Sequence, residues 1–231
     1  MTQDLTILIL CGGKGERLRP LTHNLPKPLI EVNSKPILSY IFDHLTGYGF
    51  DNFIIGTGYK SQKIEEYLVK VKPTFKYKTI DSGDVDIIDR LKDTSDHIKK
   101  DFMILYGDTI SDVDISSLIK FHGSHNNPIT MTVWPLRTEF GVVDLSPDNE
   151  VIEFQEKPEL GKWINIGYFY CKHEVLDMIA DYQTFEDFLY AASEQRIISA
   201  YKHKKNHLTI NNLSELDKAE KELSKITGDQ E

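Results

Sequence analysis

Cysteine is scarce in this chain, with two residues among 231, Cys11 and Cys171. Both lie in apolar runs of the kind that form strands, so we expect two buried thiols rather than a disulfide or a pair of metal ligands. No cysteine spacing typical of zinc ligation is present in the sequence. The sequence therefore gives no sign of a disulfide framework or a zinc site.

An excess of positive charge is also lacking. The chain has 27 Lys and Arg against 36 Asp and Glu, a formal net charge of −9. This balance argues against broad binding to DNA, RNA or an anionic membrane, because those partners need an extended basic surface. A local basic pocket could still hold a phosphorylated substrate, so we expect a small-molecule partner and neither nucleic acid nor membrane.

Long hydrophobic runs are missing as well. No apolar stretch approaches the roughly 20 residues that a membrane-spanning helix needs. Residues 1–6 are acidic and polar and lead into an expected strand, which is unlike a signal peptide. The expected location is therefore the cytoplasm. With 231 residues, 40% of them hydrophobic, the chain suits one α/β domain or a domain with a small appendage.

Apolar runs and helical spacings alternate through the first half of the chain. This alternation predicts a doubly wound, mostly parallel sheet with helices on both faces. The expected strands are residues 6–11, 51–57, 75–80 and 102–106, and the expected helices are residues 37–45, 61–69, 88–98 and 115–122, the last after a possible cap at Asp114.

The pattern changes after residue 125, where short strands separated by turn residues follow one another. We expect these strands to form a mixed or antiparallel extension of the same sheet. No repeat, low-complexity segment or linker interrupts the chain, so one compact domain is expected. The expected elements are strands at residues 129–135, 141–145, 151–155 and 164–170, a helix at 185–195, a strand near 208–210 and a final helix at 213–226.

A glycine-rich loop follows the first expected strand, which ends at Leu10-Cys11. Its sequence, residues 12–18, is GGKGERL. Glycines let the main chain turn sharply and bring N–H groups close to an anion, and Arg17 could add a bidentate contact to phosphate. The loop matches neither the P-loop pattern nor the dinucleotide pattern GxGxxG. Alone, it could also be a turn that only links strand to helix.

Two further residues could join an anion site. Lys27 stands between Pro26 and Pro28, which predicts an extended, rigid segment that fixes the lysine. Asp108 follows the FMILY strand, and ligands of open parallel sheets sit at the carboxyl ends of strands. Asp108 could therefore hold a hard cation near the glycine loop, whereas Asp112 and Asp114 are better candidates for turn or cap roles.

The segment LCGGKGERLRPLT, followed by PKPLIEVNSKPIL, resembles the amino-terminal signature of the sugar-phosphate nucleotidyltransferase family. The resemblance implies a Rossmann-like doubly wound, mixed and mostly parallel sheet in a single nucleotidyltransferase domain over residues 1–231. Residues 1–125 would form its nucleotide-binding half and residues 126–231 its acceptor-binding half. It implies an enzyme of the EC 2.7.7 type, in which main-chain groups of the glycine loop hold an NTP.

The same resemblance assigns roles to individual residues. Arg17 would touch the triphosphate, Lys27 would neutralise charge during transfer, and Asp108 would bind Mg²⁺. A second metal-binding Asp of the family corresponds here to Asn211. Because asparagine carries no charge, a role of Asn211 in the metal site is doubtful. Asn212 and Glu215 could instead form a capping box beside it. The predicted nucleotide-binding residues are Leu10, Gly12, Gly13, Gly15, Glu16, Arg17, Lys27, Gly83, Arg90 and Gly107.

The acceptor side rests on three family-like segments. Glu156 and Lys157 of EKP would hold the acceptor, Asn165 and Gly167 of NIGYF would line its pocket, and Gly141 of FGVV would approach it through the backbone. From EKP alone, Lys157 could equally be a salt-bridged surface lysine. The sequence also allows a homo-oligomer.

Substrate choice follows from the middle of the chain. Gly83, Arg90 and Leu91 are similar to a segment of glucose-1-phosphate cytidylyltransferases, which makes CTP the first choice, ahead of GTP and dTTP. The acceptor would be a hexose or heptose 1-phosphate, or a non-sugar phosphate or phosphonate. Asn211 motivates a rival of another class, a non-catalytic, nucleotide-sensing regulatory subunit.

Overall fold

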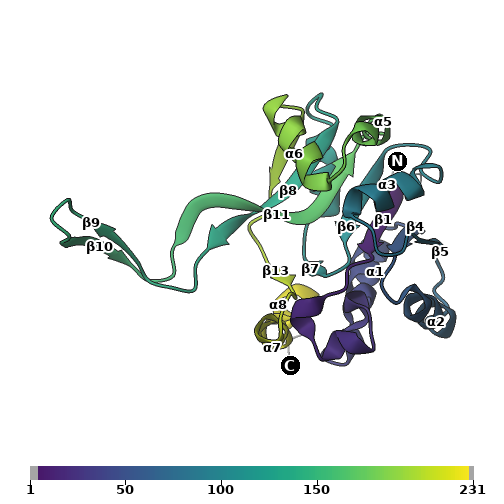
Figure 1. Cartoon of the computed structure of the whole chain (residues 1–231), viewed down its shortest axis with the longest axis horizontal. Coiled ribbons are helices and arrows are strands. Elements are labelled where there is room, and N and C mark those ends of the chain that lie inside the picture. Colours follow the sequence, from purple (N-terminus) through teal and green to yellow (C-terminus); the bar gives the residue numbers. More distant parts are fainter. Residues whose placement is uncertain (1–4, 229–231) are drawn as a thin grey trace.

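The computed structural model describes residues 5–228 and centres on a seven-stranded sheet (Figure 1). Only β11 runs antiparallel to its neighbours, and the other sheet contacts are parallel. This confirms the prediction of a doubly wound, mixed and mostly parallel sheet. In spatial order the strands are β12 (Ile198–Lys202), β8 (Ile129–Arg137), β11 (Glu159–Cys171), β6 (Phe102–Tyr106), β1 (Thr6–Cys11), β4 (Asn52–Thr57) and β5 (Lys76–Asp81).

The sheet is buried on both faces because its central strands are apolar throughout. On β1, Ile7 and Ile9 face one hydrophobic cluster, whereas Leu8 and Leu10 face another. The first cluster is closed by α1 (Ile37–Gly47), α2 (Ser61–Val71), α4 (Ile115–His122) and α7 (Leu213–Glu222). The second is closed by α3 (Ile87–Ser95), α5 (Val175–Met178) and α6 (Phe185–Glu194).

The chain order creates a switch point between β1 and β6. From β1 the chain moves outward through β4 to β5, and then returns to the opposite side of β1 as β6. The carboxyl ends of these two strands lie side by side, with Leu10 paired to Tyr106. The segments that leave them in opposite directions open a crevice, which is where open α/β sheets bind ligands.

A second, small sheet fixes the carboxyl-terminal part of the chain to this crevice. β7 (Thr109–Ser111) begins directly after Asp108 and pairs antiparallel with β13 (His207–Thr209). The N–H of Ile210 donates to the carbonyl of Asp108 over 3.2 Å. The residue that follows, Asn211, is thereby held next to Asp108.

The strands β9 (Val142–Leu145) and β10 (Val151–Gln155) pair only with each other. The prediction that they extend the central sheet is wrong. Their hairpin projects from the body between β8 and β11, toward the left in Figure 1. Alternation along a strand shows that one face is apolar but not which surface that face meets. We call residues 138–158 the arm.

Other predictions needed smaller corrections. Lys27 is not extended, since it begins the 3₁₀ turn η3 (Lys27–Leu29) with Pro28 at its second position. α3 ends at Ser95 rather than at residue 98, and the final helix is divided at Leu223 into α7 and α8 (Ser224–Thr227). The sequence did not predict β12, α5, β7 or the short pair β2 (Glu31–Val32) and β3 (Lys35–Pro36).

The remaining predictions on packing hold. Both Cys11 and Cys171 are buried free thiols, and burial raises the pKa of each. Asp114 caps α4 by accepting from the N–H of Ser117. Among the described residues, no helix has the length and apolar character that crossing a membrane requires.

Candidate active site

A cavity of about 250 Å³ lies at the switch point. Because β1 is apolar to its end and is followed by glycines, the chain can turn there without filling the crevice with side chains. The cavity is lined by Leu10, Cys11, Gly12, Gly13, Lys27, Pro28, Val85, Ile87, Arg90, Tyr106, Gly107 and Asp108. Six of the ten residues predicted to bind the nucleotide are in this set.

Two glycines of the loop are required by its shape. Gly15 has φ 58°, a left-handed conformation that favours glycine, and it precedes the 3₁₀ turn η1 (Glu16–Leu18). At Gly12, an added Cβ would stand 2.0 Å from the Arg90 guanidinium carbon. Gly13 has nothing within 4 Å of the same added atom. Gly12 is therefore needed for close packing, whereas Gly13 leaves open space for a ligand.

Arg90 lies beneath the loop rather than across the cavity. Its guanidinium donates to the carbonyls of Thr57 at 3.1 Å, Val85 at 3.2 Å and Gly83 at 2.9 Å. The side chain is 3% exposed, and burial lowers its pKa. These bonds fix the 83–85 segment beside the cavity.

A polar cluster stands at the mouth of the cavity. The Lys27 ammonium donates to Asp108 Oδ2 over 2.5 Å and to Asn211 Oδ1 over 3.0 Å. Arg17 Nη2 donates to the same Asn211 oxygen over 3.2 Å. Lys27 is largely buried, with 12% of its side chain exposed, and Asp108 has 26% exposed. Two cations from residues 17–27, the distant carboxylate of Asp108 and the amide of Asn211 thus meet beside the glycine loop.

The capping box expected near Asn211 is present and orients it. Asn212 Oδ1 accepts from the N–H of Glu215 at 2.9 Å, which caps α7. Glu215 in return accepts from the Asn211 N–H at 2.7 Å and from the Asn212 side chain at 3.0 Å. The Asn211 side chain remains directed at Lys27, so the capping box does not turn it away from Asp108.

The oxygen atoms of Asp108 and Asn211 are of the type that a hard cation prefers. Both accept from one ammonium group, so they are close enough to share a single positive centre. Magnesium is commonly held by one or two carboxylates, with phosphate oxygens and water completing its shell. No group of three or more His, Cys, Asp or Glu with metal-ligand geometry occurs among residues 5–228. The residues thus fit an ion that is completed by a phosphorylated substrate.

The remaining nucleotide-side residues flank the cavity. Glu16 lies outside it and pairs with Arg19 at 3.0 Å. Gly83 adopts φ 69° and turns the segment that Arg90 holds. Gly107 is packed against Cys11 and the Leu10 carbonyl, where a Cβ would come within 2.8 Å of both. The ion pair of Lys14 with Asp84 at 2.5 Å links the glycine loop to the 83–85 segment.

Tyr106 lines the cavity but was not singled out from the sequence. Asn165 and Gly167, from β11, lie next to it: a Cβ on Gly167 would come within 2.4 Å of the Tyr106 ring. Burial raises the pKa of Tyr106 to about 12. A hydrogen bond with Asn165 has the opposite, smaller effect. The phenol is therefore protonated near neutral pH and offers a hydrogen-bond donor at the cavity wall. The sequence feature that could have identified Tyr106 as a cavity residue is its position at the end of the FMILY strand, next to Gly107 and Asp108.

None of the predicted acceptor residues lines this cavity, although Asn165 and Gly167 adjoin Tyr106 in its wall. Gly141 and Glu156 lie on the arm and contact each other there, since a Cβ on Gly141 would be 3.2 Å from Glu156 Oε2. Lys157, at the root of the arm, is exposed and lines a groove of about 380 Å³ together with residues 206–208. The predicted acceptor site is therefore divided between the body and the arm.

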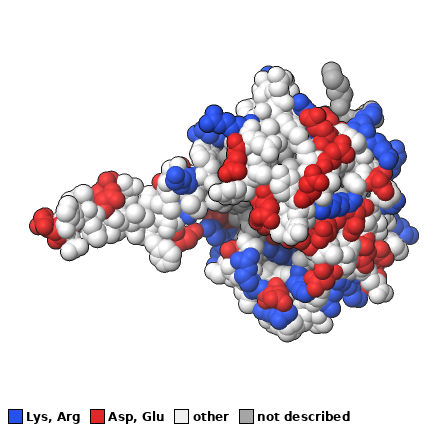
Figure 2. Space-filling model, turned by 45° about the horizontal axis from the view of Figure 1, so that its top comes forward, with Lys and Arg blue, Asp and Glu red and all other residues white. Residues whose placement is uncertain are grey.

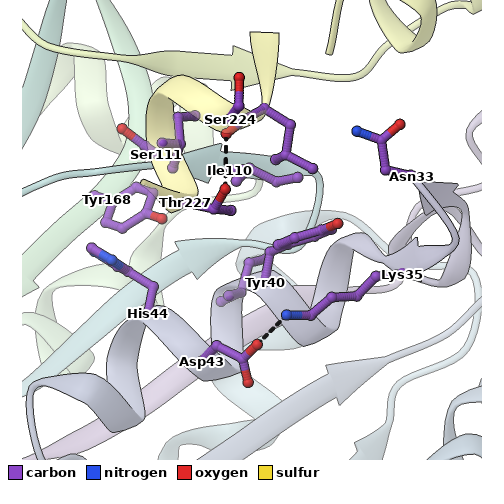
Figure 3. Close-up of a pocket in the computed structure, with 13 residues that line it drawn as sticks. Asn33, Lys35, Tyr40, Asp43, His44, Ile110, Ser111, Tyr168, Ser224 and Thr227 are labelled. Carbon is purple, nitrogen blue, oxygen red and sulfur yellow. Dashed lines mark hydrogen bonds and ion pairs between the residues drawn. The ribbon is translucent and has the colours of Figure 1, made fainter. Parts of the chain in front are cut away.

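A larger cavity, of about 620 Å³, lies between α1, β7 and the carboxyl-terminal helix (Figure 3). Lys35 and Asp43 form an ion pair on one side of it, and Ser111 and Thr227 are on another. Neither Asp108 nor a residue of the glycine loop lines it. The larger volume of this cavity therefore does not make it the candidate active site. We choose the smaller cavity because charged side chains converge there beside the backbone of the glycine loop.

Comparisons with known proteins agree with the geometry. Residues 6–215 match the family model described as "Nucleotidyl transferase". The glucose-1-phosphate cytidylyltransferase of Salmonella typhi is 32% identical, with 85% of this chain and 87% of the relative covered. The UTP–glucose-1-phosphate uridylyltransferase of Synechocystis is 29% identical, with 78% and 52% covered. The crystal structure of HddC from Yersinia pseudotuberculosis superposes with a TM-score of 0.75 at 22% identity, covering 95% of this chain and 99% of HddC, which supports the fold.

Proposed function

Since this chain belongs to the nucleotidyl transferase family, we propose that it couples an NTP to a sugar 1-phosphate or a similar phosphorylated small molecule, releasing pyrophosphate. The observation that carries this proposal is the cluster of Arg17, Lys27 and Asp108 at the mouth of the glycine-loop cavity. Two cations and a carboxylate in that place suit a polyphosphate with its counter-ion.

The chemistry would be an in-line displacement. An oxygen of the acceptor phosphate forms a bond to the α-phosphorus of the NTP, while the bond from that phosphorus to the α–β bridging oxygen breaks. The bonding electrons leave with pyrophosphate. The attacking phosphate is already anionic, so no protein nucleophile or general base is required. The protein contributes position and charge neutralisation, which can account for most of the rate gain in phosphoryl chemistry.

Each residue of the cluster has a distinct part in this scheme. Main-chain N–H groups at Gly12, Gly13 and Gly15 would hold the triphosphate, with Arg17 at its outer oxygens. The Lys27 ammonium would leave Asp108 to neutralise the transferring group. When bound between Asp108 and Asn211, Mg²⁺ would add positive charge at the phosphates, which is the chemistry that it supplies in phosphoryl transfer.

CTP is the proposed donor. The support is the similarity to a cytidylyltransferase over 85% of this chain, together with Gly83 and Arg90 beside the cavity. The curated relatives differ in the base that their names give, cytidylyl in one and uridylyl in another. GTP and dTTP are therefore the alternatives to test. The proposed acceptor is a hexose or heptose 1-phosphate, with a non-sugar phosphate or phosphonate as the alternative.

A pyrophosphate-release assay tests the proposal directly. The purified chain is incubated with Mg²⁺ and each of CTP, GTP, UTP, dTTP and ATP, combined with a panel of sugar 1-phosphates and phosphonates. We expect release that requires both substrates and is fastest with CTP. Release with another NTP would correct the base. NTP binding in calorimetry without release from any pair would contradict an enzyme and favour a regulatory, nucleotide-sensing subunit.

A further inference from the structure

The order of the strands divides the edge of the sheet at the switch point. The groups that could hold a nucleotide, which are the glycine loop and the 83–85 segment, follow β1 and β5. Both strands lie on one side of β6, in the order β11-β6-β1-β4-β5, and β11 lies on the other side. We therefore expect the second substrate of a transfer at Asp108 to lie over the ends of β6 and β11.

The arm does not reach the part of that substrate nearest to Asp108. It projects away from the body, toward the left in Figure 2, and carries Gly141 and Glu156 with it. No residue of the arm, all of which the structure describes, lines the cavity beside Asp108. Contacts close to the transferring phosphate therefore fall to side chains of the body, at the ends of β6 and β11.

Tyr106, the last residue of β6, occupies that position. Tyr168 pairs with Leu105 across the antiparallel contact of β11 and β6, so Gly167 lies opposite Tyr106. A Cβ on Gly167 would come within 2.4 Å of the Tyr106 ring. The ring therefore lies over the β11 backbone, in space that any larger residue at position 167 would fill. This contact holds the ring on the β11 side of its strand, away from β1.

The hydrogen bonds around Tyr106 determine what its hydroxyl can do. The N–H of Gly167 donates to Asn165 Oδ1 over 2.8 Å, which engages the oxygen of that amide. Asn165 also forms a side-chain hydrogen bond with Tyr106. Because the amide oxygen is engaged, the amide N–H₂ is left to donate to the phenol oxygen. The proton of the Tyr106 hydroxyl is therefore free to be donated to an oxygen of a ligand.

The phenol also lies close to the place of the transfer. Tyr106 stands two residues before Asp108, a separation of at most about 7 Å along the chain. Both residues line the same cavity, and Asp108 accepts from the Lys27 ammonium. A donor in this place meets atoms next to the acceptor phosphate rather than the far end of the molecule. In a sugar 1-phosphate, the hydroxyl nearest to the phosphate is the one on C2.

We propose that Tyr106 determines acceptor specificity by donating its hydroxyl proton to the C2 hydroxyl of a sugar 1-phosphate. This inference rests on the proposed function and narrows its acceptor to a sugar 1-phosphate with an oxygen at C2. A 2-deoxy sugar phosphate or a simple phosphonate would leave the phenol without a partner. Sites that bond a substrate hydroxyl reject analogues that lack it, because the polar group of the site is then unpaired.

The first measurement compares acceptors that differ only at C2. Pyrophosphate release is followed with glucose 1-phosphate, its C2 epimer mannose 1-phosphate, and 2-deoxyglucose 1-phosphate, in Mg²⁺ and the most active NTP. We expect Tyr106→Phe to lower kcat/KM for the preferred epimer about fivefold to tenfold, the scale of one hydrogen bond. The loss with 2-deoxyglucose 1-phosphate should stay below about twofold, and the KM for NTP should not change.

Tyr170→Phe is the matched control. Tyr170 lies on β11 and pairs with Met103 of β6, but its hydroxyl donates to Asp101 over 3.5 Å, at the other end of β6. This variant should keep the wild-type kcat/KM for all three acceptors. Equal losses with the hydroxylated and the deoxy acceptor in Tyr106→Phe would contradict the proposal, because they would indicate disturbed packing rather than a lost hydrogen bond.

Binding without turnover separates this inference from the proposed function. Calorimetry with the same three compounds, in Mg²⁺ and α,β-methylene analogues of the NTPs, should show tighter binding of one epimer than of 2-deoxyglucose 1-phosphate. Tyr106→Phe should remove that difference. If the difference is present although no pair releases pyrophosphate, the proposed function fails and the role of Tyr106 stands. If neither epimer binds more tightly than the deoxy compound, or if Tyr106→Phe keeps the difference, the role of Tyr106 is overturned.

Discussion

The nucleotide side and the arm are built in opposite ways. At the switch point, buried strands end together, and Lys27 is held by Asp108 and Asn211 with little of its side chain exposed. On the arm, Glu156 and the apolar face of the hairpin lie in solvent. The nucleotide half of the proposed site is thus preorganised, whereas the acceptor residues on the arm are exposed to solvent.

This difference separates two kinds of energetic demand. Charge stabilisation during transfer requires groups that do not reorganise, which a rigid sheet edge provides. Enclosure of an acceptor requires a wall that can open for entry and exit, which a projecting hairpin can provide. Changes on the nucleotide side should therefore affect turnover, and changes at the arm root should affect acceptor affinity.

The largest effect is expected at the charged cluster. Lys27→Ala or Asp108→Asn should lower kcat at least about 100-fold, the scale for removing one preorganised electrostatic group. Pyrophosphate release under saturating substrates measures it. The exposed ion pair of Lys35 and Asp43 offers a control, and Asp43→Asn should leave kcat within about twofold. Near-normal kcat in either variant would contradict the idea that the nucleotide side controls turnover and the arm side controls acceptor affinity.

The next effect tests how tightly the nucleotide side is packed. Gly12→Ala should lower the free energy of unfolding by about 1–3 kcal/mol, because its Cβ would overlap the buried Arg90 guanidinium. Gly13→Ala, one position on, has open space and should change stability by less than about 1 kcal/mol. Urea unfolding measures both. Equal costs would indicate that Arg90 moves freely and does not support the loop.

A smaller effect is expected at the arm root. Lys157→Ala should raise the acceptor KM about tenfold, consistent with loss of one charge-assisted hydrogen bond, and should leave the KM for NTP unchanged. Lys162→Ala on the exposed start of β11 is the matched control. Steady-state kinetics with each substrate varied in turn separates the two constants. A rise in the KM for NTP instead would place Lys157 on the nucleotide side.

The smallest effect concerns the metal. Asn211→Asp adds a second carboxylate beside Asp108 and should lower the Mg²⁺ concentration for half-maximal activity about threefold to tenfold, because affinity rises with ligand charge. Asn212→Asp keeps an effective helix cap and should leave the Mg²⁺ requirement unchanged. A magnesium titration of both variants decides whether the ion lies at residue 211 or is held by Asp108 alone.

The sheet and the nucleotide side could be predicted largely from sequence because their signals are local. Continuous apolar runs identified β1 and β6, and the positions of the glycine loop and of Asp108 at their ends followed from the topology. Arg90 lines the cavity, but its three carbonyl partners lie in segments whose shape no sequence pattern specifies. Tyr106 was overlooked for a similar reason, since its neighbours lie on β11.

The arm could not be placed from sequence. The short runs at residues 141–145 and 151–155, separated by turn residues, correctly indicated strands, yet such runs do not specify the surface that a strand packs against. The pairing of β7 with β13 was equally hidden, because both strands are three residues long and about a hundred positions apart. Long-range pairing of short segments has no local signature.

That late pairing has a consequence for biosynthesis. Asn211 meets Lys27 across 184 positions and Arg17 across 194. During translation the amino-terminal half emerges first and can fold around its own strands. The cluster of Arg17, Lys27 and Asp108 nevertheless lacks Asn211 until residue 211 has left the ribosome. A prematurely terminated chain would thus retain its glycine loop without the contacts that Asn211 makes with Lys27 and Arg17.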